Sequence, residues 1–191
     1  MKNETVFEEE TFSGKIYEKV DFSKQMFQHC LFENCRFIES RFCNSQFGFS
    51  VFKNCELQCV NFEKCRMQEV TFEECKIVGA EFYKCDPAFL SPTFLKSILL
   101  TCNFSGLKLK NCIFRESTLK GCHFVETALV GADFKNAQFE DTLFHHADLT
   151  GADFREAENY AIDPRSSKLK KARFSLSGAV SLLKALEIII D

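Results

Sequence analysis

The sequence predicts an all-β solenoid with a short repeat, and two periodic features carry that prediction. A large apolar residue falls at every fifth position over most of the 191-residue chain. A second ladder, of small side chains, lies two residues before most of those positions. A period of five matches neither the 3.6 residues of an amphipathic helix nor the 2 of a strand. A fixed internal period is typical of repeat proteins, in which each unit buries its apolar side by stacking on its neighbours.

The ladder of large residues runs from Phe7 to Phe82 and, after a two-residue shift, from Phe89 to Phe154. Of the 23 phenylalanines, only Phe49 and Phe174 lie outside these runs. Each pentad then directs one large and one small side chain inward, and four pentads close a square coil. We expect stacked rings to fill the axis, with a core ladder that includes Phe32, Phe52, Phe72, Phe104, Phe114, Phe124, Phe134, Phe144 and Phe154.

The eleven cysteines mostly belong to the ladder of small residues. Eight of them occupy positions at which serine, alanine and threonine also occur. We interpret them as small, polarisable core residues of a chain in a reducing cytosol. A linear stack of thiols does not offer the tetrahedral arrangement that zinc prefers. Cys43, Cys59 and Cys85 fall at outward or break positions and are expected to be the more reactive thiols, with their redox role left open.

The clearest repeat units are Ala132-Asp133-Phe134, Ala147-Asp148-Leu149-Thr150-Gly151 and Ala152-Asp153-Phe154. These units, and the pattern over roughly residues 5 to 155, resemble the pentapeptide-repeat family. The resemblance implies a right-handed quadrilateral β-helix. Thirty pentads at four per coil then give about seven and a half coils, and a spacing of ~4.8 Å per coil gives a rod of ~36 Å.

The chain divides into a solenoid over residues 1–160, with a register break at 83–88, and a C-terminal cap over 161–191. Proline cannot donate to a ladder hydrogen bond, so Pro87 and Pro92 indicate a kink or bulge. Outward positions near the break are unusually apolar: Ala88, Leu90, Leu95, Ile98 and Leu100. Either they cover the kink or they form a small patch for a partner, so the role of the segment from Pro87 to Leu100 stays open.

A short amphipathic helix is expected within residues 175–186, followed by an apolar tail. Ser175 or Ser177 is the expected N-cap, and the apolar stripe consists of Leu176, Ala179, Val180, Leu183 and Leu186. The tail, with its three isoleucines, either packs on the cap or pairs with a second copy across a two-fold axis. We therefore expect a dimer interface formed by Leu183, Leu186, Ile188, Ile189 and Ile190.

The order of these features, over residues 129 to 190, resembles one subgroup of the family. A long solenoid is followed by Asn159-Tyr160-x-Ile162-Asp163-Pro164, a short helix and an apolar tail. The subgroup comprises Qnr-type quinolone-resistance proteins and immunity proteins against gyrase-poisoning microcin and albicidin. The resemblance implies a homodimer that mimics DNA, occupies the DNA-binding saddle of DNA gyrase and protects the enzyme. The chain lacks the protruding loops of some members, which favours protection against a peptide or natural-product toxin over protection against quinolones. The alternative is a scaffold solenoid with an unrelated protein partner.

Charge counts give limited support to DNA mimicry. Acidic against basic residues number 14 to 10 over residues 1–82, 8 to 7 over 83–154 and 5 to 7 over 155–191. The small acidic excess lies in the N-terminal half, where the candidate partner-binding residues are Glu8, Glu9, Glu33, Glu73 and Glu74. No basic stripe is evident in these counts, so direct nucleic-acid binding is not expected.

The sequence contains no motif of an enzyme or of a bound cofactor. It has no phosphate-binding glycine-rich loop and no Gly-x-Ser-x-Gly elbow. Of the four histidines, His123 and His145 are the one pair expected to be neighbours on adjacent coils, and a solvated pair is a better interpretation than a metal site. No signal peptide and no apolar run long enough to span a bilayer are evident, so we expect a cytoplasmic, non-enzymatic protein.

Overall fold

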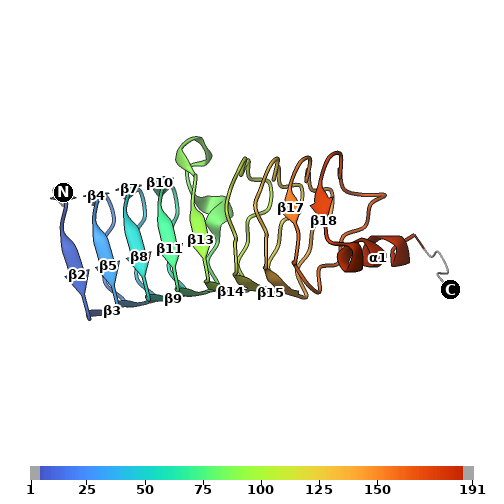
Figure 1. Cartoon of the computed structure of the whole chain (residues 1–191). Coiled ribbons are helices and arrows are strands. Elements are labelled where there is room, and N and C mark those ends of the chain that lie inside the picture. Colours follow the sequence, from blue (N-terminus) through green and yellow to red (C-terminus); the bar gives the residue numbers. More distant parts are fainter. Residues whose placement is uncertain (1–4, 187–191) are drawn as a thin grey trace.

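The chain winds into a right-handed quadrilateral β-helix of about eight turns, which one short helix follows within the described residues (Figure 1). This computed structural model describes residues 5–186. Successive coils pair in parallel with a register of twenty residues, so that Phe12 faces Phe32 and Phe32 faces Phe52. Backbone groups bond from coil to coil, for example from the Glu9 N–H to the Gln28 carbonyl at 2.9 Å. The predicted fold class is therefore confirmed.

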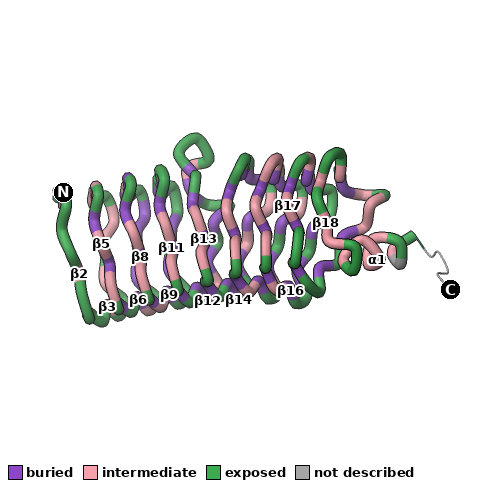
Figure 2. The backbone as a smooth tube through the Cα atoms, in the orientation of Figure 1, coloured by how far each residue is buried: buried purple, intermediate pink, exposed green. Residues whose placement is uncertain are grey.

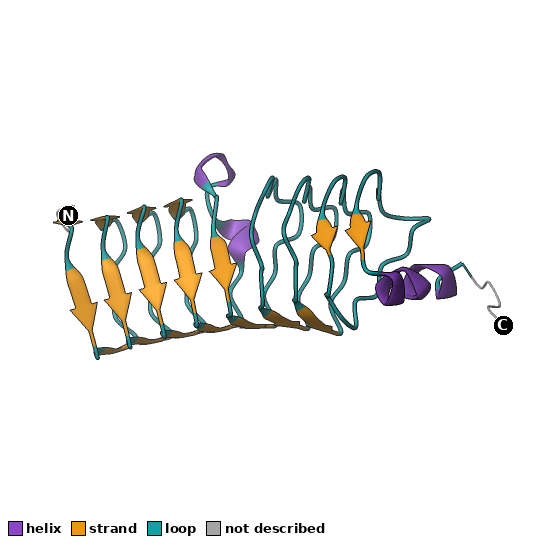
Figure 3. Cartoon of the chain, in the orientation of Figure 1, coloured by secondary structure: helices purple, strands orange, loops and turns teal. Residues whose placement is uncertain are grey.

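The rod has four faces, numbered here in chain order, and short strands mark three of them (Figure 3). The first face carries β1 (Val6–Glu8), β4 (Met26–Gln28), β7 (Gln46–Gly48) and β10 (Arg66–Gln68). The second carries β2 (Thr11–Ser13), β5 (Leu31–Glu33), β8 (Val51–Lys53), β11 (Thr71–Glu73), β13 (Thr93–Leu95), β17 (Asp153–Phe154) and β18 (Arg173–Phe174). The third carries β3 (Ile16–Glu18), β6 (Arg36–Ile38), β9 (Glu56–Gln58), β12 (Lys76–Val78), β14 (Ile98–Leu100), β15 (Thr118–Lys120) and β16 (Gln138–Glu140). The fourth face is paired by single bridges, such as Asp21 to Arg41.

Aromatic columns fill the interior. On the second face nine rings, from Phe12 to Phe174, stack with centroids 4.6 to 5.3 Å apart. This column meets that of the fourth face edge to face, as where Phe104 and Phe114 lie 5.6 Å apart at 89°. Every residue of the expected core ladder is buried, and burial follows the inward side of each coil (Figure 2). Such aromatic contacts add about 0.5–1.5 kcal/mol per pair to the area buried.

The ladder of small residues satisfies backbone groups inside the corners. Ser50 Oγ donates to the Phe27 carbonyl at 3.2 Å and accepts the Cys30 N–H at 3.1 Å. The Cys55 thiol bonds the Phe32 carbonyl at 3.2 Å in the same way. Serine, threonine and cysteine are interchangeable here because each supplies one short side-chain donor to a carbonyl 23 residues earlier.

The register break differs from the sequence prediction in one position. Phe89, predicted to be inward, is 43% exposed, and Leu90, predicted to be outward, is 7% exposed and bridges Met67. Two 3₁₀ turns, η1 (Phe82–Lys84) and η2 (Pro87–Phe89), absorb the inserted residues. Because η2 advances the chain by one extra residue, the inward side chain of this coil shifts from position 89 to 90. The second, third and fourth faces resume in register, with Phe72 facing Phe94.

The last coil runs through residues 155–174, so the boundary expected at residue 160 falls within it. Asp148 is bridged to Lys168, and Phe154 faces Phe174 across β17 and β18. Helix α1 (Leu176–Lys184) then leaves the end of the rod. Ser175 is its N-cap residue, although the Ser175 side chain makes no capping hydrogen bond.

Candidate binding surface

The described part of the rod offers shallow surface hollows rather than an enclosed site. One of the larger, of about 500 Å³, is lined by Thr118, Gln138, Phe139, Glu140, Asp141 and Asn159. Within residues 5–186, no cluster of three or more histidine, cysteine or acidic side chains is arranged to hold a metal ion. His123 is aligned with Leu143 on the next coil, whereas the His145 ring lies against that of His146 at 3.9 Å. No described helix is both long and apolar enough to cross a lipid bilayer.

The five candidate acidic residues lie on two different faces. Glu8 and Glu9 are exposed on the first coil of the first face. Glu33 and Glu73 lie on the second face with Lys53 between them in the strand register, and Lys53 Nζ is 4.0 Å from Glu73. Glu74 follows at the corner of the same face, in a left-handed conformation with φ of 53°. The structure therefore brings together three of the five candidates and places a cation among them.

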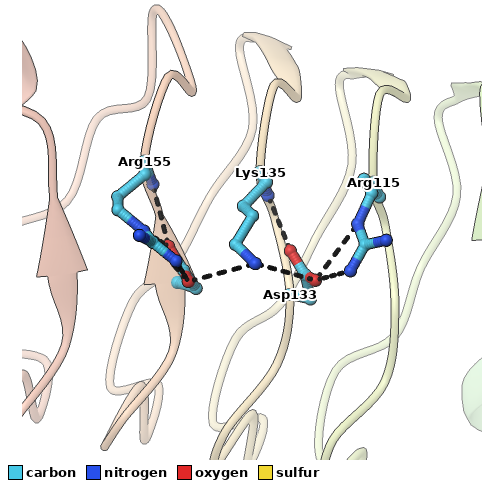
Figure 4. A network of polar contacts seen from close by, with 5 residues as sticks. Arg115, Asp133, Lys135 and Arg155 are labelled. Atoms are coloured by element: carbon cyan, nitrogen blue, oxygen red, sulfur yellow. Dashed lines mark hydrogen bonds and ion pairs between the residues drawn. The ribbon is translucent and has the colours of Figure 1, made fainter.

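Farther along the second face, acidic and basic side chains form a continuous network (Figure 4). Arg115 Nε donates to Asp133 Oδ2 at 3.2 Å, and Lys135 Nζ lies 3.8 Å from the same oxygen. Lys135 Nζ is also 3.5 Å from Asp153, which pairs with Arg155 at 2.8 Å. The hydrogen bond from the Arg155 side chain lowers the pKa of the Asp153 carboxyl below its usual value. This half of the face is thus close to neutral.

On the third face, too, ion pairs between adjacent coils compensate the charges. Glu56 lies between two cations, 2.9 Å from Arg36 Nε and 3.9 Å from Lys76 Nζ. Lys120 Nζ lies 2.6 Å from the carboxylate of Glu140. Neither of these two faces is a uniform acidic stripe, and surface pairs of this kind contribute about 0–1 kcal/mol each.

Two of the expected dimer residues, Leu183 and Leu186, lie at the end of the rod beyond the last coil. Leu183 and Leu186 are exposed on and just after α1, while Ile188, Ile189 and Ile190 lie outside the described residues. Leu182, which the predicted apolar stripe did not include, packs on the core, and Leu176, which it did, is 88% exposed. The helix therefore turns a different side to the rod than the stripe suggested and leaves leucines uncovered by the described chain.

The prediction of reactive thiols is correct in exposure for one cysteine and wrong for two. Cys59 is exposed, whereas Cys43 and Cys85 are buried. Burial raises the pKa of the Cys85 thiol to about 12, which keeps it protonated and unreactive. The Asp86 N–H donates to the Cys65 carbonyl at 2.9 Å, so Cys85 still follows the buried Cys65 in the ladder of small residues, and the extra residues come after it.

Sequence reasoning missed two exposed features of the first face. The first is a pair of aromatic contacts: Phe49 stacks on His29 with centroids 5.2 Å apart, and the Arg66 guanidinium lies 4.6 Å from the centroid of the Phe89 ring. The second feature is a group of lysines that the solenoid gathers from distant parts of the chain: Lys108, Lys110, Lys168, Lys170 and Lys171. A sorting of outward residues by face would have found this group, whereas a linear charge count does not.

Comparison with known proteins agrees with this architecture. The family model described as the pentapeptide repeat region matches residues 25–89 and 92–174. No curated protein sequence matches the chain. A trypsin-treated form of QnrB1, a plasmid-mediated fluoroquinolone resistance protein, superposes with a TM-score of 0.82 at 18% identity, over 99% of this chain and 100% of that one.

Two further solved structures show the same fold less closely. Full-length QnrB1 superposes with a TM-score of 0.55 at 16% identity, over 96% of this chain and 100% of that one. HetL, a pentapeptide repeat protein involved in heterocyst differentiation in the cyanobacterium Nostoc, gives a TM-score of 0.58 at 12% identity, over 88% and 86% of the two chains. At these identities the likeness establishes the fold alone.

Proposed function

The chain belongs to the pentapeptide repeat family, and from that premise we propose that it is a non-enzymatic binding protein that protects a type II topoisomerase. In this proposal its partner is DNA gyrase, and it shields the enzyme in the cytoplasm from a toxin or an antibiotic. The observation that carries the proposal is the whole-length match of rod and terminal helix to QnrB1, whose description is that of a fluoroquinolone resistance protein.

The shape of the molecule supports binding through its outer surface. The interior is filled by side chains, so the described rod has no lumen for a substrate. A stiff rod with a regular coil spacing can lie along an extended groove of a partner with little loss of conformational freedom, which favours binding. Leu183 and Leu186 are uncovered by the described chain and would pair two rods end to end, doubling the length of the binding surface.

The acidic candidates would contact the partner from the N-terminal coils. Within the described residues, Glu33 and Glu74 have no ion pair, whereas Asp133 and Asp153, farther along the second face, are held by cations. An unpaired carboxylate loses no existing interaction when it meets a basic surface, so the N-terminal half is the part of this face best suited to a DNA-binding groove.

A supercoiling assay with purified gyrase tests this proposal. The protein should inhibit the enzyme or rescue it from a gyrase poison, and the double variant Glu33→Lys, Glu74→Lys should weaken that effect. The matched control is Glu116→Lys with Glu156→Lys, which changes the same charge at C-terminal corners of the same face. No effect of the natural protein at micromolar concentration, with or without poison, would refute the proposal.

The second candidate is a scaffold solenoid with an unrelated protein partner. The observation that favours it is the coil-to-coil ion pairing, which neutralises most of the second and third faces and leaves little resemblance to DNA. The absence of any effect of the natural protein on gyrase would favour this candidate, and affinity capture with the natural chain would then seek the partner.

A further inference from the structure

The C-terminal half of the first face has an unusual charge. This face runs along the upper edge of the rod in Figure 1, where β4, β7 and β10 are labelled. From residue 108 onward its outward positions hold five lysines, here called the lysine face: Lys108, Lys110, Lys168, Lys170 and Lys171. The same positions hold one carboxylate, Asp148, which the register places between Ala128 and Lys168.

The lysine face differs from the second and third faces in that most of its charged side chains form no ion pair within residues 5–186. Lys168 Nζ lies 3.4 Å from Asp148, but no ion pair joins the other four lysines to any described residue. On the second and third faces, by contrast, cations alternate with carboxylates from coil to coil. Like charges gathered without counter-charges repel one another, so this arrangement opposes folding and favours an anionic partner.

Short side chains separate the two groups of lysines. Between Lys108 and Lys110 at one end and the three lysines at the other lie Ala128, Val130, Gly131, Thr150 and Gly151, together with Asp148, whose carboxylate pairs with Lys168. Both glycines have φ of 70°, and a Cβ atom on Gly131 would clash with the Asn111 side chain, so Asn111 covers this corner on one coil while Gly151 adds no side chain on the next. Lys108 and Lys168 are three coils apart, which corresponds to ~14 Å at ~4.8 Å per coil.

The chemistry of the face selects among anionic partners. Lysine is depleted at the core of protein interfaces, where aromatic residues and arginine are enriched, and this face has neither. Single-stranded nucleic acid is held by aromatic side chains on which bases stack, and the residues between the two groups of lysines include no aromatic side chain. Lysines act as point charges toward phosphate, and the ~14 Å between the two groups is close to the width of the major groove of duplex DNA, which is roughly 12 Å and is bordered by the two phosphate backbones.

We propose that the lysine face binds the phosphate backbone of duplex DNA without reading its sequence. This inference goes beyond the protection of a topoisomerase and does not depend on it. It also differs from the expectation drawn from charge counts, because lysines sixty residues apart in sequence come to lie on one face only in the folded rod. We expect no contact with the bases, because no side chain between the two groups of lysines is long enough to reach into a groove.

Binding of a short fluorescent DNA duplex, followed by anisotropy in the absence of any topoisomerase, tests the inference. Four lysine–phosphate contacts predict that the logarithm of the affinity falls with that of the salt concentration with a slope of about −3.6, or on the order of 100-fold between 50 and 200 mM. The test variant replaces four lysines of the face by glutamine: Lys108, Lys110, Lys170 and Lys171. The matched control makes the same change in net charge on the second and third faces, at Lys53, Lys76, Lys120 and Lys135.

The test variant should lose DNA binding while the control keeps it. All four replaced lysines of the face are exposed, so its thermal unfolding should stay as in the natural chain. If it does not, the pair Lys170→Gln, Lys171→Gln should still reduce the slope by about two. Three results would overturn the inference: no binding by the natural protein at 50 mM salt, equal losses in variant and control, or tighter binding to single strands than to duplex. Binding to polyglutamate without binding to DNA would also overturn it and would indicate an acidic protein surface instead.

Discussion

Replacement of Phe114 by alanine should destabilise the rod far more than replacement of an exposed phenylalanine. The Phe114 ring is fully buried and contacts four others, with centroids 5.0 Å from Phe94 and Phe134, 5.6 Å from Phe104 and 5.4 Å from Phe124. Deletion of a buried phenyl ring costs about 3–5 kcal/mol. The coils pair at fixed spacing on all sides, so the cavity cannot collapse readily, and the upper part of that range is expected.

Calorimetry at one fixed protein concentration measures this effect. For a chain of this size each kcal/mol lowers the melting temperature by about 2–4 °C, so Phe114→Ala should melt roughly 6–20 °C below the natural chain. Phe114→Leu should lose less than about 1.5 kcal/mol because it largely conserves volume, and Phe49→Ala, at an exposed corner, is the control with little change. A melting temperature for Phe114→Ala within a degree or two of the natural value would show that the ring is not part of a stacked core.

Three further measurements follow from local geometry. In the native protein one thiol, that of Cys59, should react rapidly with a thiol reagent, and the variant Cys59→Ser should show none; fast labelling of a second thiol would contradict the observed burial. The variant Gly178→Ala should loosen α1, because the added Cβ would clash with Tyr160 Oη. Adding Tyr160→Phe should restore the amide protection of the helix, because it removes this buried hydroxyl, which has no hydrogen-bond partner in the described structure. Unchanged hydrogen exchange in Gly178→Ala would refute this. The pKa of the Asp153 carboxyl is lowered in the folded protein, so the carboxylate stabilises the fold fully above its ordinary pKa of about 3.9 and loses this effect as pH falls through the folded-state pKa. The difference in melting temperature between the natural chain and Asp153→Asn should therefore shrink from pH 7 to pH 3. A constant difference would count against the ion pair.

The architecture was predictable because the core side chains themselves recur with the period of the repeat. Phe12, Phe32 and Phe52 each bury one ring at the same point of successive coils, so their spacing in sequence is the register of the ladder. The small residues are equally informative, since Ser50 and Cys55 fill the same corner position with the same hydrogen bond. A solenoid has few long-range alternatives, and period alone therefore fixes most of its contacts.

The break was predicted in its place but not in its detail. Two residues are added by count, yet the choice between Phe89 and Leu90 as the inward side chain depends on how η2 turns. The Asp86 side chain accepts the Ala88 N–H at 3.1 Å and begins that turn, while Arg66 covers the displaced ring of Phe89. Periodicity carries no information about either contact, because each involves a residue of the inserted segment, Asp86 in one case and Phe89 in the other.

The surface was less predictable than the core, and the reason is geometric. A linear count treats Arg115, Asp133 and Arg155 as scattered charges, whereas the register makes them members of one ion-pair network. The same register gathers Lys110 and Lys170 on the C-terminal half of the first face, where the outward positions hold a single carboxylate, Asp148. Charge on such a rod acquires meaning only after outward residues are sorted by face and coil. On that basis the described part of the chain is no uniform imitation of DNA: Glu33 and Glu74 are unpaired on the N-terminal half of the second face, unpaired lysines gather on the C-terminal half of the first face, and ion pairs join coils on the second and third faces, so each face of the rod suits a different partner.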